Sequence, residues 1–270
     1  MGDIDSTNLN PIAFTLNGAR VVVNVEDGVS LLDALRDQLD VISPKDGCQP
    51  QGSCGCCTVL IEGKPRLACI TRAVSVAGKR VTTCEGLSAA ERKLVAECFL
   101  HAGGTQCGYC TPGIVMRAEA LLERNPDPTR EEIAHELRGH LCRCTGYAKI
   151  IDAIRLLARA RRGDSLPAAA SDGRVGSSLR RYQGADLVLG QRRFIADIKW
   201  PGMVFGALRF SDHPRARVRR IHTAPAEKLD GVLRVVTAAD VPGERLVGNI
   251  RRRHHAQHAV QLLRRRRVNP

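Results

Sequence analysis

Two groups of four cysteines constrain this 270-residue chain more than any other feature. The first set is Cys48, Cys54, Cys57 and Cys69, and the second set is Cys107, Cys110, Cys142 and Cys144. The sequence does not open with the basic and apolar segments of a secretory signal, so we expect a cytoplasmic location in which thiols stay reduced. Clustered reduced cysteines bind metal more often than they form disulfides. Two sets of four thiolates therefore predict two metal centres, with the remaining chain as scaffold and docking surface.

The spacing of the first set narrows the choice of metal. Four thiolates can hold zinc, [2Fe–2S] or [4Fe–4S], and zinc sites favour widely separated C-x2-C pairs. The first set is close to the plant-type C-x4-C-x2-C arrangement of [2Fe–2S] proteins. It keeps two residues between Cys54 and Cys57 but has five, not four, between Cys48 and Cys54. Cys48 is thus the ligand that departs from the plant-type pattern.

The second set combines a C-x2-C pair with a C-x-C pair. Both pairs are expected at helix ends, where free backbone N–H groups stabilise thiolate charge. Three cysteines remain outside the two sets. We expect Cys56 to point away from its neighbours in an extended loop and to bind no metal, and Cys84 and Cys98 to pack as small apolar side chains.

Residues 10–86 predict a small sheet folded over one helix. Asn17-Gly18 lies between two β-like runs and is a strong hairpin signal, and Ser30 is suited to cap the helix that follows. The expected elements are strands over 12–17 and 20–25, a helix over 31–40, a hairpin over 58–69 and a strand over 79–82.

Residues 87–162 change to a helical period and predict four short helices with the second set at their junctions. Pro112 suits a first helical turn, and Thr129 suits an N-cap. The expected helices cover 88–104, 111–126, 130–140 and 147–161.

The last hundred residues are less regular. Residues 163–178 have the composition of a linker, and residues 179–248 contain strand-like runs at 203–210, 218–222 and 232–236. Residues 249–270 are expected to be a disordered basic tail, and their abrupt change of composition also raises the hypothesis of a frameshifted gene product. The net charge of +13 reflects this tail, which holds seven arginines, so we do not expect nucleic-acid binding.

The cysteine motifs carry a family resemblance. The segments GSCGCCTV with the later RLAC, then QCGYCTPG and HLCRCTGYAKI, resemble the two-cluster iron–sulfur subunit of molybdenum hydroxylases, the group of xanthine dehydrogenase, aldehyde oxidase and carbon monoxide dehydrogenase. The resemblance covers residues 10–160. It implies that the first set binds one [2Fe–2S] cluster in a β-grasp, ferredoxin-like domain over 10–86, and that the second set binds another in a four-helix domain over 87–162.

The resemblance also implies a partner. In this family the cluster of the helical domain lies nearest the molybdopterin, and a glutamine before its first cysteine contacts the pterin; Gln106 matches that position, although it could equally cap a helix end. Residues 179–248 resemble the opening α/β-hammerhead part of the molybdopterin-binding large subunit, here truncated. The chain has no G-x-G-x-x-G dinucleotide motif.

We therefore expect an α+β protein that is the electron-transfer component of a molybdenum hydroxylase. Electrons would pass from a molybdopterin site on a partner subunit through two [2Fe–2S] clusters to FAD on another subunit or to a different acceptor. Alone, the chain should turn over no substrate. The sequence shows no apolar run long enough to span a membrane. The alternatives are a zinc-stabilised interaction module and a non-functional product of a frameshifted gene.

Overall fold

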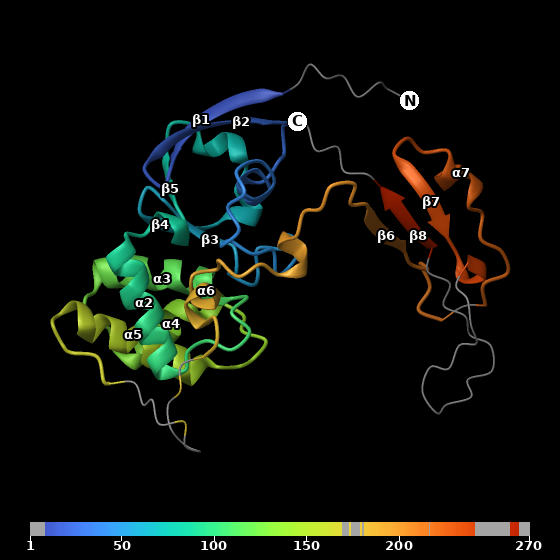
Figure 1. The fold of residues 1–270 in the computed structure, drawn as a ribbon. Helices are drawn as coiled ribbons and strands as arrows, with labels where there is room; N and C mark the ends of the chain where they lie inside the picture. Colours follow the sequence, from blue (N-terminus) through green and yellow to red (C-terminus); the bar gives the residue numbers. More distant parts are fainter. Residues whose placement is uncertain are drawn as a thin grey trace. The chain divides into compact units, whose positions relative to one another are not determined.

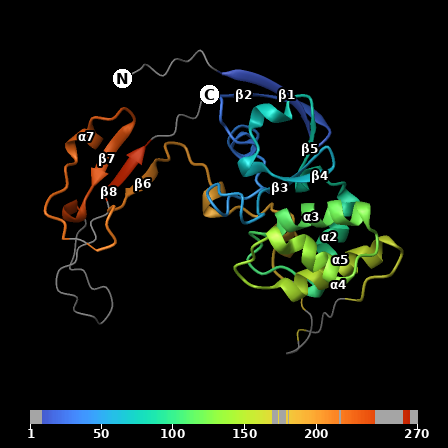
Figure 2. The same ribbon diagram turned by 180° about the vertical axis from the view of Figure 1, so that it is seen from behind.

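The computed structural model describes residues 9–168, 173, 179, 181–215, 217–240 and 260–264. The chain divides into two units, Met1–Asp197 and Ile198–Pro270. Figure 1 shows them coloured along the sequence, and Figure 2 shows the same ribbon from behind.

A five-stranded sheet forms the N-terminal part of the first unit. Its strands run in the order β2-β1-β5-β3-β4. The bounds are β1 Asn10–Leu16, β2 Ala19–Val25, β3 Thr58–Ile61, β4 Lys64–Leu67 and β5 Arg80–Thr82. Asn17 and Gly18 both have positive φ (52° and 86°), which gives the two-residue turn that matches strand twist. β5 is the central strand of the sheet, parallel to β1 and antiparallel to β3.

One helix packs against this sheet and completes the expected β-grasp arrangement. Ser30 caps α1, Leu31–Asp33, by accepting a hydrogen bond from the backbone N–H of Asp33, and the helix continues as a π-helix over Ala34–Gln38. The apolar face of this helix is buried together with the inner face of the sheet. Its core includes Phe14, Val23, Leu31, Leu35 and Val59.

Four helices form the second part of the first unit and lie below the sheet in Figure 1. They are α2 Ala89–Ala102, α3 Thr111–Arg124, α4 Arg130–Glu136 and α5 Tyr147–Arg161. Capping boxes at Ser88/Glu91 and Thr129/Glu132 start α2 and α4 by satisfying free N–H groups. Gly103, in the left-handed conformation, ends α2. These helices bury one apolar core, which includes Phe99, Ile114, Ile133, Ile150 and Ile154.

The first unit also contains a segment that we expected to belong to the C-terminal region. Helix α6, Gly184–Val188, contacts α2 and α3, and a 3-10 turn follows at Ile195–Asp197. The side chains of Leu187, Val188 and Leu189 are buried there. Residues 184–197, which we expected to belong to the hammerhead-like segment 179–248, therefore pack with the first unit. Most of the expected linker, 163–178, lies outside the described residues.

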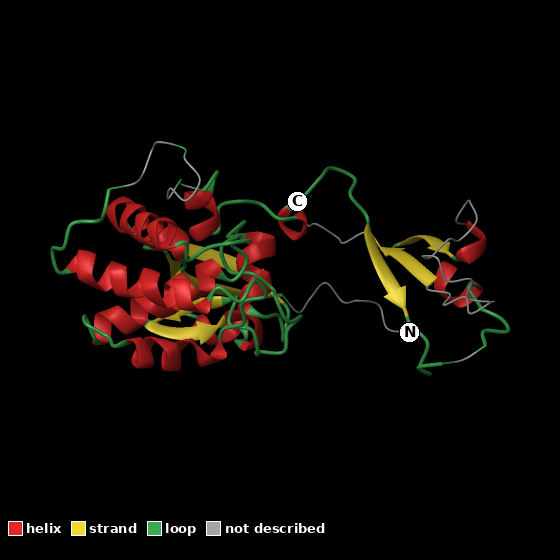
Figure 3. Ribbon diagram, turned by 90° about the horizontal axis from the view of Figure 1, so that it is seen from below, coloured by secondary structure: helices red, strands yellow, loops and turns green. Residues whose placement is uncertain are grey.

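The second unit contains a small antiparallel sheet of order β6-β8-β7, seen as yellow arrows in Figure 3. Its elements are β6 Phe205–Arg209, α7 Ala224–Glu227, β7 Val232–Val236 and β8 Val260–Arg264. The expected strand over 218–222 is absent from this described stretch. The place beside β6 and β7 is taken by β8, from the tail expected to be disordered, because the apolar run at 260–264 pairs with both neighbours. The rest of the tail, 249–259 and 265–270, lies outside the described residues.

Large apolar side chains of the second unit lie at its surface. They include Trp200, Phe205, Leu208, Phe210 and Leu233, and the exposed fraction of Trp200 is 72%. Among the described residues, no helix is both long and apolar enough to cross a membrane.

Candidate iron–sulfur sites

The first set of cysteines comes from one long loop and one short helical turn. Cys48, Cys54 and Cys57 lie between the π-helix and β3, and Cys69 lies in the 3-10 turn that follows β4. The Cys48 thiol lies beside that of Cys54, which also faces Cys56, and the Cys57 thiol lies beside that of Cys69. The structure thus brings together all four residues predicted from the spacing.

The extra residue between Cys48 and Cys54 is accommodated by a turn. Gln49 and Gly52 have positive φ (51° and 66°), which bends the loop back on itself. The N–H of Gln51 lies 3.3 Å from the Cys48 sulfur, and the N–H of Ser53 also points at it. Partial burial would raise the pKa of the Cys48 thiol, but these N–H donors outweigh it and lower that pKa to about 6. Despite its unusual spacing, Cys48 lies in a position that favours thiolate.

The other thiols of the first set are buried. Burial raises the pKa of Cys57 to about 12, and it also raises the pKa of Cys54. Backbone N–H groups oppose burial at both sulfurs: that of Cys69 points at Cys57, and that of Cys56 points at Cys54. Such donors are the groups that stabilise charge on cluster sulfurs.

Cys56 does not point away from its neighbours, as an extended loop would require. Gly55 has a φ of +72°, so the loop turns here instead of running straight. A Cβ atom built on Gly47 would lie 2.9 Å from the Cys54 sulfur and 3.1 Å from the Cys56 sulfur, so both sulfurs face Gly47. Burial, followed by the nearby Cys54, raises the pKa of the Cys56 thiol. That Cys56 binds no metal stays a prediction.

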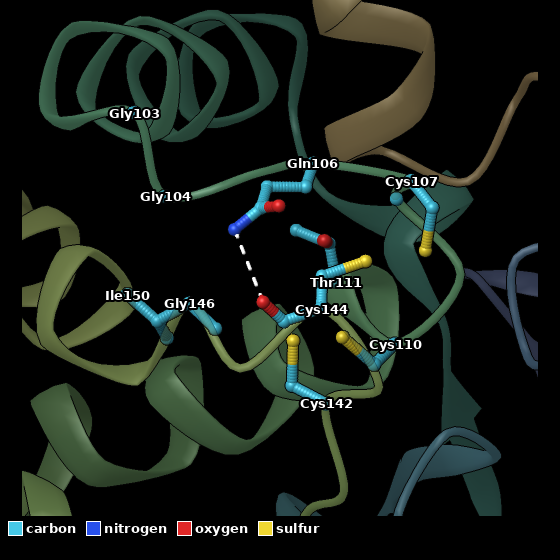
Figure 4. Close-up of a pocket in the computed structure, with 11 residues that line it drawn as sticks. Gly103, Gly104, Gln106, Cys107, Cys110, Thr111, Cys142, Cys144, Gly146 and Ile150 are labelled. Carbon is cyan, nitrogen blue, oxygen red and sulfur yellow. Dashed lines mark hydrogen bonds between the residues drawn. The ribbon is translucent and has the colours of Figure 1, made fainter.

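The second set gathers beside the end of α2 and the starts of α3 and α5 (Figure 4). Cys107 and Cys110 precede α3, whereas Cys142 and Cys144 lie between α4 and α5. The thiols again form two pairs: Cys107 with Cys144, and Cys110 with Cys142. Burial and then the neighbouring Cys142 raise the pKa of Cys110 to about 12.

A small hollow lies over the second set. It is lined by Gly103, Gly104, Gln106, Cys107, Gly108, Cys110, Thr111, Cys142, Cys144, Gly146 and Ile150. The Gln106 side-chain amide donates to the carbonyl oxygen of Cys144 at 3.3 Å, and the dashed line in Figure 4 marks this bond. Gln106 is exposed, so it lies at the surface of the site.

The two sites contact each other through their backbones. The N–H of Leu141 donates to the carbonyl oxygen of Cys54 at 2.9 Å, joining the residue before Cys142 to a residue of the first set. Close packing supports this bond: a Cβ on Gly113 in α3 would lie 2.4 Å from the carbonyl oxygen of Gly55. One hydrogen bond therefore links the chain segments that hold the two sets.

Two residues near the second set were not anticipated. The hydroxyl of Tyr147 accepts from the N–H of Cys142 at 2.8 Å and donates to the carbonyl of His140 at 3.0 Å, which holds the C-x-C segment in place. His140 is buried, and burial together with the Arg117 guanidinium lowers its pKa to about 4. Its Nδ1 has no hydrogen-bond partner among the described residues. The position of Tyr147 directly after the C-x-C-T-G motif could have indicated its contact with the C-x-C segment.

The donor sets fit [2Fe–2S] clusters. Each iron of such a cluster takes two protein sulfurs, and each set supplies two thiol pairs. A single zinc ion instead needs four donors around one point. The paired sulfurs and their N–H donors fit a two-iron cluster.

Comparison with known families agrees with this geometry. Residues 14–85 match the family described as 2Fe-2S iron-sulfur cluster binding domain, and residues 83–155 match the [2Fe-2S] binding domain family. Residues 189–269 match the aldehyde oxidase and xanthine dehydrogenase a/b hammerhead domain. This last match continues through the basic tail.

Some relatives are about as long as the two cluster domains, and others are several times longer than this chain. The chain is 45% identical over 145 residues to the nicotinate dehydrogenase small FeS subunit of Eubacterium barkeri, covering 53% of this chain and 92% of that one. It is 36% identical over 254 residues to the aldehyde oxidoreductase of Megalodesulfovibrio gigas, covering 87% of this chain but 28% of the relative. The crystal structure of the aldehyde oxidoreductase from Desulfovibrio desulfuricans ATCC 27774 superposes with a TM-score of 0.80 at 34% identity, covering 87% of this chain and 27% of that one.

Two [2Fe–2S]-binding domains followed by a hammerhead segment define an iron–sulfur component of an oxidoreductase. The α+β class predicted from the sequence is confirmed. The chain belongs to the family of two-cluster iron–sulfur subunits of molybdenum hydroxylases, here fused to a partial hammerhead segment.

Proposed function

We propose that this chain carries electrons one at a time between a molybdopterin-binding partner and an acceptor such as a flavin. The observation that carries the proposal is the pairing of eight thiols into two four-sulfur sites whose backbones share the hydrogen bond from Leu141 to Cys54. A [2Fe–2S] cluster supplies one-electron redox chemistry at each site. The role of the chain is to hold the two sites at a fixed separation.

The ligands are the eight cysteines of the two sets. Backbone N–H groups at Cys48, Cys57 and Cys107 would stabilise the reduced form and so raise the reduction potential. Burial acts in the opposite direction, because a reduced cluster carries more negative charge. The residues around each site thus set the difference in potential between them.

The second set is proposed to face the molybdopterin-binding partner. Its hollow lies beside exposed Gln106 and exposed Cys107, whereas Cys54, Cys57 and Cys69 of the first set are buried. Gln106 is proposed to contact the pterin of the partner. Electrons would then leave through the first set toward FAD on another subunit or a different acceptor.

Metal analysis after anaerobic purification tests the proposal. We expect about four iron and about four labile sulfide per chain, and two distinct signals in the EPR spectrum of the reduced protein. A colourless protein with about two zinc per chain would instead support an interaction module. A single EPR signal would contradict the assignment of one of the two sets.

Co-expression tests the partner. We expect the chain to purify together with a molybdopterin-binding subunit encoded by the same organism and to reduce an added acceptor only in that complex. A cluster-loaded chain that binds no such subunit would support the alternative of a non-functional gene product.

A further inference from the structure

Residues 184–197, called the strap below, cross both cysteine-bearing regions of the first unit. They lie outside the two cluster-domain matches, which end at residue 155. The strap begins with α6, which contacts α2 and α3, and it ends at Asp197, the last residue of the first unit.

The strap first contacts the helical domain beside the second set. A Cβ built on Gly184 would lie 2.2 Å from a methyl carbon of Leu100 in α2. Gly108, between Cys107 and Cys110, has a φ of +84°, and a Cβ there would lie 2.8 Å from a methyl carbon of Leu187. The backbone of the C-x2-C motif therefore packs directly on the strap with no space for a side chain.

The strap then reaches the segment that leads into the first set. Gly190 has a φ of +73°, and its built Cβ would lie 2.7 Å from the Cα of Ser43 and 2.7 Å from a ring carbon of Pro112. Ser43 is itself held by the Glu85 carboxylate, which accepts from its N–H at 3.0 Å. Gly190 of the strap therefore packs between the sheet domain and α3.

A buried ion pair fixes the end of the strap. The Asp197 carboxylate lies 2.6 Å from the Lys45 ammonium and 2.5 Å from the Arg36 guanidinium. The side chains of Lys45 and Asp197 are each 1% exposed. The N–H of Phe194 also donates to this carboxylate at 2.8 Å, and the Phe194 ring packs edge-on against Tyr109 at 5.1 Å.

The positive side of this ion pair belongs to the loop of the first set. The backbone N–H of Lys45 donates to the carbonyl of Cys56 at 3.1 Å. The Arg36 guanidinium donates to the carbonyl of Pro44 at 2.8 Å. Asp197 therefore balances the positive charges of Lys45 and Arg36. Both residues make other hydrogen bonds that fix the shape of the loop holding the first set. Without it, Lys45 would be a buried ammonium with no carboxylate at hydrogen-bond distance among the described residues.

We propose that the strap is a clamp for both cysteine-bearing regions and that Asp197 is a positioning residue whose bond to Lys45 keeps the first cluster in place. The surface around Lys45, Arg36 and Tyr109 is thus a binding site for an acidic segment led by an aromatic residue, and the chain's own Phe194–Asp197 occupies it. A chain without the strap would need an equivalent segment from a partner.

The first test cleaves the chain before the strap and measures whether the strap stays bound to the N-terminal fragment. A protease site replaces residues 169–172 of the full-length protein. After cleavage, we expect the two fragments to elute together in gel filtration, and we expect Asp197→Asn to make them separate. Asp212→Asn is the matched control, because Asp212 forms an exposed ion pair with Arg209 in the second unit. Separation of the unsubstituted fragments would overturn the proposal, as would co-elution of the Asp197→Asn fragments.

The second test measures cluster retention in the uncut protein during incubation with an iron chelator. We expect Asp197→Asn to lose the EPR signal of the first cluster about tenfold faster, or more, than the parent protein, because it leaves a buried charge unpaired. The signal of the second cluster should be affected less. Equal loss rates in Asp197→Asn and Asp212→Asn would overturn the role of the ion pair.

A double variant distinguishes loss of the ion pair from general misfolding. Lys45→Met combined with Asp197→Leu replaces the ion pair by apolar side chains of similar volume, which buried sites often tolerate. We expect this variant to retain the first cluster better than Asp197→Asn alone, and equal loss in the two would contradict the proposal. The retention test rests on the proposed cluster sites, whereas fragment co-elution does not, so the two can fail separately.

Discussion

Single glycines decide how closely the two cysteine-bearing regions approach. Gly113 lies within α3, where alanine normally stabilises a helix by about 0.5–1 kcal/mol. Here the added Cβ would lie 2.4 Å from the carbonyl oxygen of Gly55 and 2.9 Å from that of Cys56. We expect Gly113→Ala to lower the free energy of unfolding by about 1–3 kcal/mol, measured by urea titration.

Gly139 provides the control for this prediction. A Cβ on Gly139 would meet no heavy atom within 4 Å, and its φ is not in the left-handed region. Gly139→Ala should therefore leave the urea midpoint nearly unchanged. Equal stability of the two variants would show that the first and second sets are less tightly packed than the structure indicates.

Individual thiols should differ sharply in their effect on sulfide content. Cys110 belongs to the second set, and its sulfur is paired with that of Cys142. We expect Cys110→Ser to reduce labile sulfide from about four to about two per chain and to remove one EPR signal. Cys98, fully buried in the helical core, is the matched control, and Cys98→Ala should keep all the sulfide. Unchanged sulfide in Cys110→Ser would contradict the ligand assignment.

At the scale of helices and strands, local signals predicted most of the first unit. Asn17-Gly18, the capping residue Thr129 and the apolar stripe of 147–161 act over a few residues, so their consequences can be read from sequence. The helix expected over 31–40 instead changes to a π-helix at Ala34, which nothing in its apolar pattern indicates.

The strap could not be predicted, because its structure depends on contacts between residues far apart in sequence. The five residues of α6 carry too short a pattern to indicate a helix, and Asp197 is buried only because Lys45 and Arg36 lie opposite it. The orientation of Cys56 was missed for a related reason: the positive φ of Gly55 redirects a loop that was assumed to be extended.

The strap should respond to acid. Burial would raise the pKa of Asp197, but hydrogen bonds from Lys45, Phe194 and Arg36 outweigh it and lower that pKa below the usual 3.8. A carboxyl with a lowered pKa contributes stability above its unfolded pKa and loses it as the pH falls through its folded pKa. We expect the stability difference between the parent and Asp197→Asn to be constant above about pH 5 and to shrink below about pH 4, measured by urea titration. A difference that grows on acidification would contradict this.

At the scale of the whole molecule, the boundary after Asp197 predicts where the chain can be shortened. Truncation after Asp197 keeps the sheet domain, the four helices and the strap. We expect this protein to retain about four iron per chain, whereas truncation after Gly163 should lose iron preferentially from the first set. Iron analysis and EPR of both truncations check this, and equal retention would show that the strap is dispensable.

The apolar surface of the second unit affects how the chain behaves in solution. Trp200, Phe205 and Phe210 are exposed within a stretch of eleven residues that follows the strap closely. Exposed aromatic side chains that lie close together in sequence favour self-association at high protein concentration. Self-association through these rings would therefore depend on the unit that contains none of the cysteines, and a bound partner that covers the rings would reduce it.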